Sequence, residues 1–202
     1  MHRVFISYHH ANDQAHKQEL IRMNTSSPIF VDGSVDTGDI ADYLDDQTIR
    51  EKIRDEYLRD TTVTLLLVGL ETGHRKHVDW ELYSSMFDGR RNKKSGIIVV
   101  TLPSTGCTNY TAAHGDAEKA RLYPNTTSWT TIDSRAGYEE RYPHLPDRII
   151  DNLATHKARI SVTNWSIIER DWGALELLIN AAHGAKEAAE YDLARPMRRR
   201  DG

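Results

Sequence analysis

The 202-residue chain contains one cysteine, Cys107, so it cannot form an internal disulfide bond. This is typical of proteins that work in a reducing compartment. No run of residues approaches the roughly 18 apolar positions that a membrane-spanning helix needs. The opening stretch "MHRVFISYHH" lacks the charged segment and apolar core of a signal peptide. We therefore expect a cytoplasmic protein without a membrane partner.

The sequence also lacks an excess of basic charge. Its net charge is −4, which predicts no general attraction to nucleic acid or to anionic membranes. The stretch 191–202 is basic, but one short run of this kind is more often a solvated end than a nucleic-acid-binding arm. Hydrophobic residues make up 39% of the chain and charged residues 28%. This balance and the length fit a single domain, 1–202, with a buried core.

Several catalytic motifs are missing. The stretch "GLETG", 69–73, matches neither the dinucleotide-binding nor the P-loop spacing, and no Gly-x-Ser-x-Gly elbow is present. A strong apolar run ends in Gly69-Leu70 instead of a phosphoacceptor aspartate, which argues against a response-regulator receiver.

Metal-binding patterns are also missing. The histidines near two predicted strand ends lack a cysteine partner or a metalloprotease frame; they are His9, His10, His74 and His77. The aspartates between 32 and 42 resemble a calcium loop only loosely, because the glycine and the closing glutamate are out of place. We expect no bound metal.

Apolar runs alternate with helical periodicities along the chain. We expect strands at 3–8, 28–34, 61–70, 96–103 and 158–165, and helices at 11–24, 46–60, 74–86 and 171–194. The unbroken apolar runs at 61–70 and 96–103 are typical of strands covered on both faces of a parallel sheet. The alternation predicts an α/β fold, doubly wound, with a mostly parallel five-stranded sheet and helices on both faces.

Two stretches have no clear element. The acidic stretch 35–48 has too few apolar residues for a strand, and we expect a loop with one helical turn; Asp46 or Thr48 can then cap the helix that follows. Residues 104–147 are long for a structureless connection, and we expect an insertion or lid before the last strand. The core then comprises 1–103 and 148–190, with a basic tail at 191–202.

Sheets of this kind bind ligands beyond the carboxyl ends of their strands. Ser7, Tyr8 and His9 follow the first strand, Asp32 follows the second, and 69–73 follow the third. These positions are therefore the candidate binding residues.

Glu81 lies about two turns into the helix that leaves the third strand. Val78, Leu82 and Met86 are spaced to face the sheet, and Glu81 borders that face beside Val78 and Leu82. Periodicity alone favours a solvated helix residue at such a border. The alternative is a carboxylate that points into the crevice.

Three stretches together resemble a TIR-type domain. They are "RVFISYHH", the acidic loop after "FVDGS", and the pattern Arg75, Val78, Glu81 after a buried strand. The chain is most similar to the TIR-like family that includes the NAD-processing subunit of Thoeris anti-phage defence systems, over residues 1–103. The resemblance implies a flavodoxin-like fold with a pocket at the carboxyl edge of the sheet.

The same resemblance implies an active site. Catalytic members need a glutamate on the helix after the third strand to break the nicotinamide–ribose bond of NAD, and here that residue is Glu81. The family often has a tryptophan where this chain has His77, and Trp80 follows three residues later. Tyr8 and Trp80 can stack on the bases of NAD or belong to the core. Resemblance and position together place these residues around the substrate: Phe5, Ser7, Tyr8, His9, Asp32, His77 and Trp80.

The resemblance further implies an NAD glycohydrolase or ADP-ribosyl cyclase with NAD as substrate and no cofactor. Water as the acceptor gives ADP-ribose, and a base nitrogen of the same molecule gives a cyclic ADP-ribose, which needs a closed pocket. The family favours a diffusible signal read by a separate effector, and self-association through TIR faces. Two alternatives stay open: a non-catalytic TIR scaffold, and a nucleoside-processing transferase of the same fold.

Overall fold

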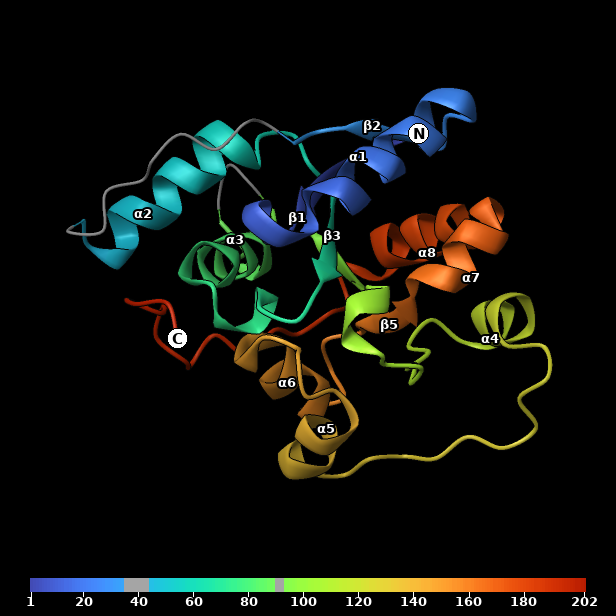
Figure 1. The fold of residues 1–202 in the computed structure, drawn as a ribbon. Coiled ribbons are helices and arrows are strands. Elements are labelled where there is room, and N and C mark those ends of the chain that lie inside the picture. The colour runs from blue at the N-terminus through green and yellow to red at the C-terminus, as the bar shows by residue number, and fades with distance from the viewer. Residues whose placement is uncertain (35–43, 90–92) are drawn as a thin grey trace.

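A five-stranded sheet forms the centre of the molecule (Figure 1). The protein is represented by a computed structural model that describes residues 1–34, 44–89 and 93–202. Most of the predicted acidic loop at 35–48 therefore lies outside the described residues. The strand order is β2-β1-β3-β4-β5, and every neighbouring pair is parallel. The strands are β1 (His2–Ser7), β2 (Phe30–Asp32), β3 (Val63–Val68), β4 (Gly96–Thr101) and β5 (Ser161–Asn164).

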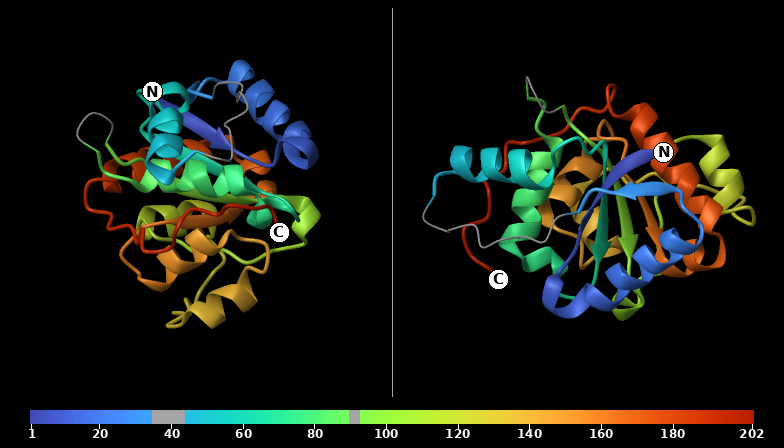
Figure 2. Two further views of the ribbon diagram at one scale, coloured as in Figure 1. Left: turned by 90° about the vertical axis from the view of Figure 1, so that its left-hand side faces the viewer. Right: turned by 90° about the horizontal axis from the view of Figure 1, so that it is seen from above.

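Helices cover both faces of this sheet, as the two views in Figure 2 show. One face packs against α1 (His10–Ser26), α4 (Asp116–Leu122), α7 (Trp165–Arg170) and α8 (Trp172–Ala185). The other packs against α2 (Asp46–Lys52), α3 (Lys76–Met86), α5 (Arg135–Arg141) and α6 (Asp147–Ala154). Short turns are η1 (Ile53–Tyr57), η2 (Thr72–His74) and η3 (Pro103–Thr105). The predicted flavodoxin-like, doubly wound α/β fold is confirmed.

The two central strands are completely buried, which explains their unbroken apolar sequences. Successive side chains alternate between the faces: Leu65 joins the cluster under α1 and α8, and Leu66 joins the cluster under α3. On α3, the spacing of Val78, Leu82 and Met86 was predicted to face the sheet, and all three are buried in the second cluster. This packing fixes the rotation of α3 and with it the direction of Glu81.

Two glycines make a matched pair for testing how tightly α8 packs on β4. A Cβ added at Gly96 would lie 2.3 Å from the carbonyl oxygen of Ala182, whereas nothing lies within 4 Å of a Cβ at Gly184, on the exposed side of α8. We expect Gly96→Ala to lower the free energy of unfolding by roughly 1–3 kcal/mol. Gly184→Ala should raise it by up to about 1 kcal/mol because alanine favours the helix. Urea denaturation of both variants measures the difference, and equal stabilities would contradict this packing.

Several predicted helix boundaries were wrong. The helix predicted at 46–60 is capped by Asp45, whose Oδ1 accepts from the backbone N–H of Thr48 at 2.9 Å, not by Asp46 or Thr48. It is α-helical only to Lys52 and continues as the π-helical turn η1. Because Asp45 offers its carboxylate one residue earlier, the helix begins at Asp46.

The predictions near the chain's end also need correction. The strand predicted at 158–165 is shorter, because Trp165 already begins α7, and α6 was not predicted. The helix predicted at 171–194 stops at Ala185, although the predicted buried side, Leu175, Leu178, Ile179 and Ala182, is buried. Beyond the helix, Asn152 holds the chain at Asp192: Asp192 N–H donates to Asn152 Oδ1 at 2.8 Å, and Asn152 Nδ2 donates to the Asp192 carbonyl at 3.0 Å.

The basic stretch 191–202 is not a solvated end. It crosses α3, with Met197 buried against Phe5 and Trp80. Trp80 Nε1 donates to the Arg198 carbonyl at 2.7 Å, and Lys76 N–H at the start of α3 donates to Asp201 Oδ1 at 2.8 Å. An aspartate is a favourable partner for a helix N-terminus. The tail therefore holds the helix that carries Glu81.

The segment 104–147 contains η3, α4 and α5 and lies along the β5 side of the sheet. It is fastened to β5 by an antiparallel bridge in which Thr111 and Val162 exchange backbone hydrogen bonds of 2.9 Å. Its final part packs close to η2, where a Cβ at Gly73 would lie 2.8 Å from the His144 carbonyl oxygen. The role of a lid over the crevice stays a prediction.

Of the helices described, none combines the length and the apolar character that crossing a membrane requires.

Candidate functional site

The order of the strands reverses between β1 and β3. β1 and β3 are neighbours, with Ser7 paired to Leu66, while β2 lies on one side of them and β4 on the other. A crevice at such a point, beyond the carboxyl ends of the strands, is where parallel α/β sheets bind ligands. Helix α3 packs against β1 on one face of the sheet, next to this point.

Glu81 points from α3 to the end of β1. Ser7 Oγ donates to Glu81 Oε2 at 2.6 Å. Ser7 is completely buried and Glu81 is 5% exposed. Glu81 is therefore not the solvated border residue that periodicity alone favoured. Within the described part of the chain, Ser7 supplies the one hydrogen-bond donor to this buried carboxyl group. Buried carboxyl groups with so few partners are uncommon and are found preferentially at functional sites.

Burial changes the proton affinity of this carboxyl group. The loss of water raises the pKa of Glu81 to about 8, and the hydrogen bond from Ser7 lowers it by less. At neutral pH the group carries a proton for most of the time. It ionises when the pH rises or when a positive charge approaches, which is the property that acid–base and charge-stabilising groups need.

A second buried polar contact connects α1 to the end of β3. Thr72 Oγ1 donates to Asp13 Oδ2 at 2.9 Å and accepts from Gly69 N–H at 2.9 Å. A side chain at position 69 would collide with Asp13, because a Cβ there lies 2.2 Å from Asp13 Oδ1. The sequence analysis missed this contact. Its only signal was a glycine placed directly after the strand.

His9 lies at the start of α1, beside the same edge. It is partly buried, and its Nδ1 has no hydrogen-bond partner among the described residues. Burial lowers the pKa of His9, and the nearby Arg75 lowers it further. His9 is therefore neutral at pH 7. Arg75, which pairs with Glu71 at 3.2 Å, was noticed in the sequence only as part of the pattern that contains Glu81.

The remaining predicted residues of β1 lie on different faces. Phe5 and Ser7 are on the face covered by α3, and Phe5 packs in the cluster that contains Trp80. Tyr8 packs in the cluster of the opposite face, and its hydroxyl donates to Gln14 Oε1 at 2.6 Å. The structure thus brings Phe5 and Ser7 to the helix of Glu81 and turns Tyr8 away from it.

The other three predicted residues, Trp80, His77 and Asp32, have different surroundings. The Trp80 ring is completely buried under the tail, so it would have to be uncovered before stacking on a ligand. His77 is exposed and lies edge-on to Trp80, with ring centroids 4.9 Å apart. Asp32 is exposed, pairs in register with Val4, and accepts from Ser34 N–H at 2.9 Å.

In the described part of the chain, no three histidine, cysteine, aspartate or glutamate side chains gather as a metal site would need. The site consists of a protonatable carboxyl group, one buried hydroxyl donor and a polar rim that includes His9 and Arg75. Such a set can bind and stabilise a cation or a developing positive charge.

Comparison with known families gives one match. The model of a family described as "Thoeris protein ThsB, TIR-like domain" matches residues 5–106, half of the chain. This range runs from β1 through η3 and includes Ser7, α3 and Glu81. No curated protein and no solved structure matches the chain.

Proposed function

The chain belongs to the family of TIR-like domains of the Thoeris protein ThsB, and from this membership we propose that it cleaves the nicotinamide–ribose bond of NAD. The observation that carries the proposal is the buried contact of Glu81 with Ser7 at the point where the strand order reverses. Glu81 stands where the family's catalytic members carry their glutamate, and its carboxyl group is buried at this edge of the sheet. NAD is the substrate, and no cofactor takes part.

The chemistry explains why a carboxylate is useful there. When the bond between the ribose C1′ and the nicotinamide nitrogen breaks, the electron pair leaves with neutral nicotinamide and positive charge develops on the ribose. An ionised Glu81 stabilises this charge and can accept hydrogen bonds from the ribose hydroxyl groups. The leaving group needs no proton, so no general acid is required.

Substrate binding itself favours the ionised form. The nicotinamide ring of NAD is positively charged, and an opposite charge nearby lowers the pKa of a carboxyl group. Glu81, protonated in the free protein at neutral pH, therefore loses its proton when the ring approaches. Ser7 Oγ, bound to one carboxylate oxygen, fixes the direction in which the other points.

We propose a cyclic ADP-ribose as the product, formed when a base nitrogen of the same molecule attacks the ribose in place of water. Such a product needs a closed pocket that folds the dinucleotide. As a diffusible signal it would activate a separate effector in anti-phage defence. This part of the proposal rests on the family to which the chain belongs.

Mass spectrometry of NAD incubated with the purified protein tests the activity, alone and with lysate of phage-infected cells. We expect release of nicotinamide together with an ADP-ribose-derived product. Glu81→Gln should reduce the rate at least about 100-fold, the usual effect of removing a charge-stabilising group. Glu118→Gln is the matched control: Glu118 is also completely buried with a raised pKa, but it lies on α4.

Two results would contradict this function. One is intact NAD under every condition with a folded wild-type protein. The other is equal cleavage by the wild type and Glu81→Gln.

A scaffold that acts by assembly is the second candidate. It is favoured by apolar side chains exposed near the sheet edge: Val31 on the edge strand β2 is 46% exposed and Leu70 after β3 is 48% exposed. Self-association through these faces is compatible with either function. Indifference to Glu81→Gln, with loss of function in Val31→Lys, would favour the scaffold.

A further inference from the structure

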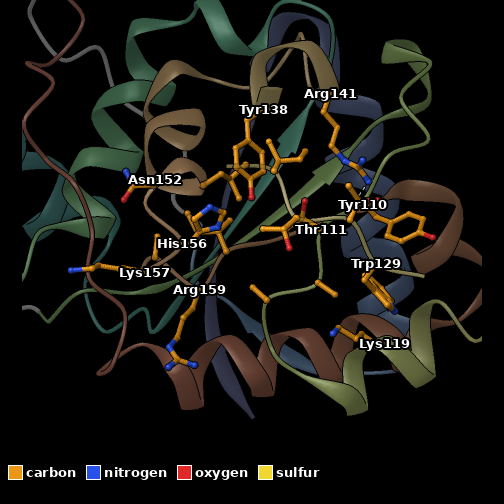
Figure 3. Close-up of a pocket in the computed structure, with 18 of the residues that line it drawn as sticks. Tyr110, Thr111, Lys119, Trp129, Tyr138, Arg141, Asn152, His156, Lys157 and Arg159 are labelled. Atoms are coloured by element: carbon orange, nitrogen blue, oxygen red, sulfur yellow. Dashed lines mark hydrogen bonds between the residues drawn. The ribbon is translucent and has the colours of Figure 1, made fainter. Parts of the chain in front are cut away.

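A cavity of about 620 Å³ lies at the β5 side of the sheet (Figure 3). Its walls come from the segment 104–147, α5, α6 and the loop 155–160 that leads into β5. The volume is in the range of small-molecule sites, roughly 300–1,000 Å³. β4 separates β5 from β3 in the sheet, so this cavity is distinct from the site at Glu81.

The wall of this cavity is basic, although the whole chain has a net charge of −4. It includes Lys119, Arg141 and Arg159, and none of these three pairs with a carboxylate within the described ranges. Lys157 also lines it and pairs with Glu190 at 3.2 Å. Unpaired cations around a concave space attract anions, and guanidinium groups suit phosphate in particular.

An aromatic side chain lies among these cations. Trp129 is 38% exposed, in a stretch between α4 and α5 that forms neither helix nor strand. Tyr110 and Tyr123 hold it edge-on, each with ring centroids 5.8 Å away, and Lys119 Nζ lies 4.9 Å from its ring centroid. An indole that is fixed in place yet partly open to solvent can stack on a planar base.

The opposite wall contains a strained loop. His156 and Arg159 both adopt left-handed backbone conformations, with φ of 56° and 51°. Such conformations are unfavourable for residues with a Cβ, and they collect at ligand-binding sites. His156 lies beside Tyr138, with ring centroids 6.1 Å apart. In Figure 3 these two side chains and Arg159 lie across the cavity from Trp129 and Lys119.

We propose that this cavity binds a phosphorylated nucleotide, with the base against Trp129 and the phosphate toward Arg159. The ring of Trp129 is suited to the planar base of such a ligand, and the cations without a carboxylate partner are suited to its phosphate. A free phosphate would leave the indole unused, and an uncharged nucleoside would leave the cations unused. The site does not depend on Glu81.

Isothermal titration calorimetry with AMP at low salt tests this proposal. Wild type and Glu81→Gln should bind AMP equally, because Glu81 does not line the cavity. Adenosine and inorganic phosphate should each bind at least about 10-fold more weakly, because each engages half of the site. NAD cleavage is not needed for any of these measurements, so the cavity and the proposed enzyme can fail independently.

Two variants test where the ligand lies in the cavity. Arg159→Gly removes the guanidinium and suits a φ of 51°, so the protein should stay folded while AMP affinity falls at least about 10-fold. Trp129→Ala should weaken AMP by a similar factor. Arg59→Gln, an exposed cation before β3, is the control and should leave binding unchanged.

Absence of AMP binding, or unchanged affinity in both cavity variants, would overturn the proposal. Phosphate that binds as tightly as AMP would reduce the site to an anion site and would also overturn it. So would an RNA oligonucleotide that binds far more tightly and resists competition by AMP.

Discussion

Replacing Glu81 with glutamine is expected to stabilise the folded protein at alkaline pH while removing NAD cleavage. The folded-state pKa of Glu81 is about 8, well above its ordinary value of 4.5. Between these two values the folded state keeps a proton that the unfolded state has lost, so the wild type loses stability as the pH rises through this window. Glutamine is neutral throughout and has the same shape.

The size of this effect follows from the shift. Each pKa unit corresponds to about 1.4 kcal/mol, so the stability of Glu81→Gln should exceed that of the wild type by on the order of 4 kcal/mol at pH 9. Near pH 4.5 the two should be nearly equal, because a protonated glutamate also accepts the hydrogen bond from Ser7. Urea denaturation of both proteins from pH 5 to 9 measures the difference, in which other titrating groups cancel.

Parallel stability curves over this range would mean that Glu81 ionises as an ordinary exposed glutamate. Glu118→Gln again provides the comparison, since burial also raises the pKa of Glu118. It should show a pH-dependent gain of the same sign and no loss of NAD cleavage. If both variants are stabilised at alkaline pH and only Glu81→Gln loses NAD cleavage, the catalytic role of Glu81 is separate from the effect of its burial.

Arg148→Met is expected to cause a large loss of stability. Arg148 is completely buried and forms two hydrogen bonds with Asp79 on α3, of 2.8 and 3.0 Å. Methionine fills similar space but leaves Asp79 buried without its cation, which costs about 3–5 kcal/mol. Denaturant unfolding measures the loss.

The same substitution should loosen the tail. Arg148 also donates to the carbonyl oxygens of Arg195 and Pro196, at 3.1 and 3.2 Å. Hydrogen exchange of the amides at 195–202 should therefore become faster in Arg148→Met. Asp79→Asn combined with Arg148→Met should recover part of the stability, because no unpaired charge remains.

A control comes from an exposed pair. Arg22 and Glu19 form a salt bridge on the surface of α1, and such pairs contribute about 0–1 kcal/mol. Arg22→Met should therefore change stability little. A loss from Arg148→Met no larger than that from Arg22→Met would show that the Asp79–Arg148 pair contributes nothing specific.

The fold could be predicted from the sequence because its signals are local. Strands β3 and β4 are buried, largely apolar runs, and the helix between them, α3, carries a periodic apolar face. The contact between Glu81 and Ser7 could not be predicted from such local signals alone. Periodicity placed Glu81 at a border, and the resemblance singled it out. Alternation along β1 does put Ser7 on the face of Phe5, but only the fold sets that face against α3.

The features that were not predicted depend on contacts between residues that are far apart in the sequence. Asp79 and Arg148 are 69 residues apart, and Trp80 and Arg198 are 118 apart. No local pattern reports such pairs. The basic composition of 191–202 suggested a solvated end because charge was visible in the sequence, whereas the buried Met197 and the backbone partners of the tail were not.

The path of the tail also determines where a segment fused to the end at Gly202 would lie. Gly202 N–H donates to the His74 carbonyl at 3.1 Å, so Gly202 lies beside the start of α3. Any segment or fused domain that continues from Gly202 leaves the molecule beside the start of α3, the helix of Glu81, next to Arg75. Met1, at the opposite end of β1 from Ser7, is 74% exposed. Affinity tags and fluorescent fusions therefore belong at the amino end.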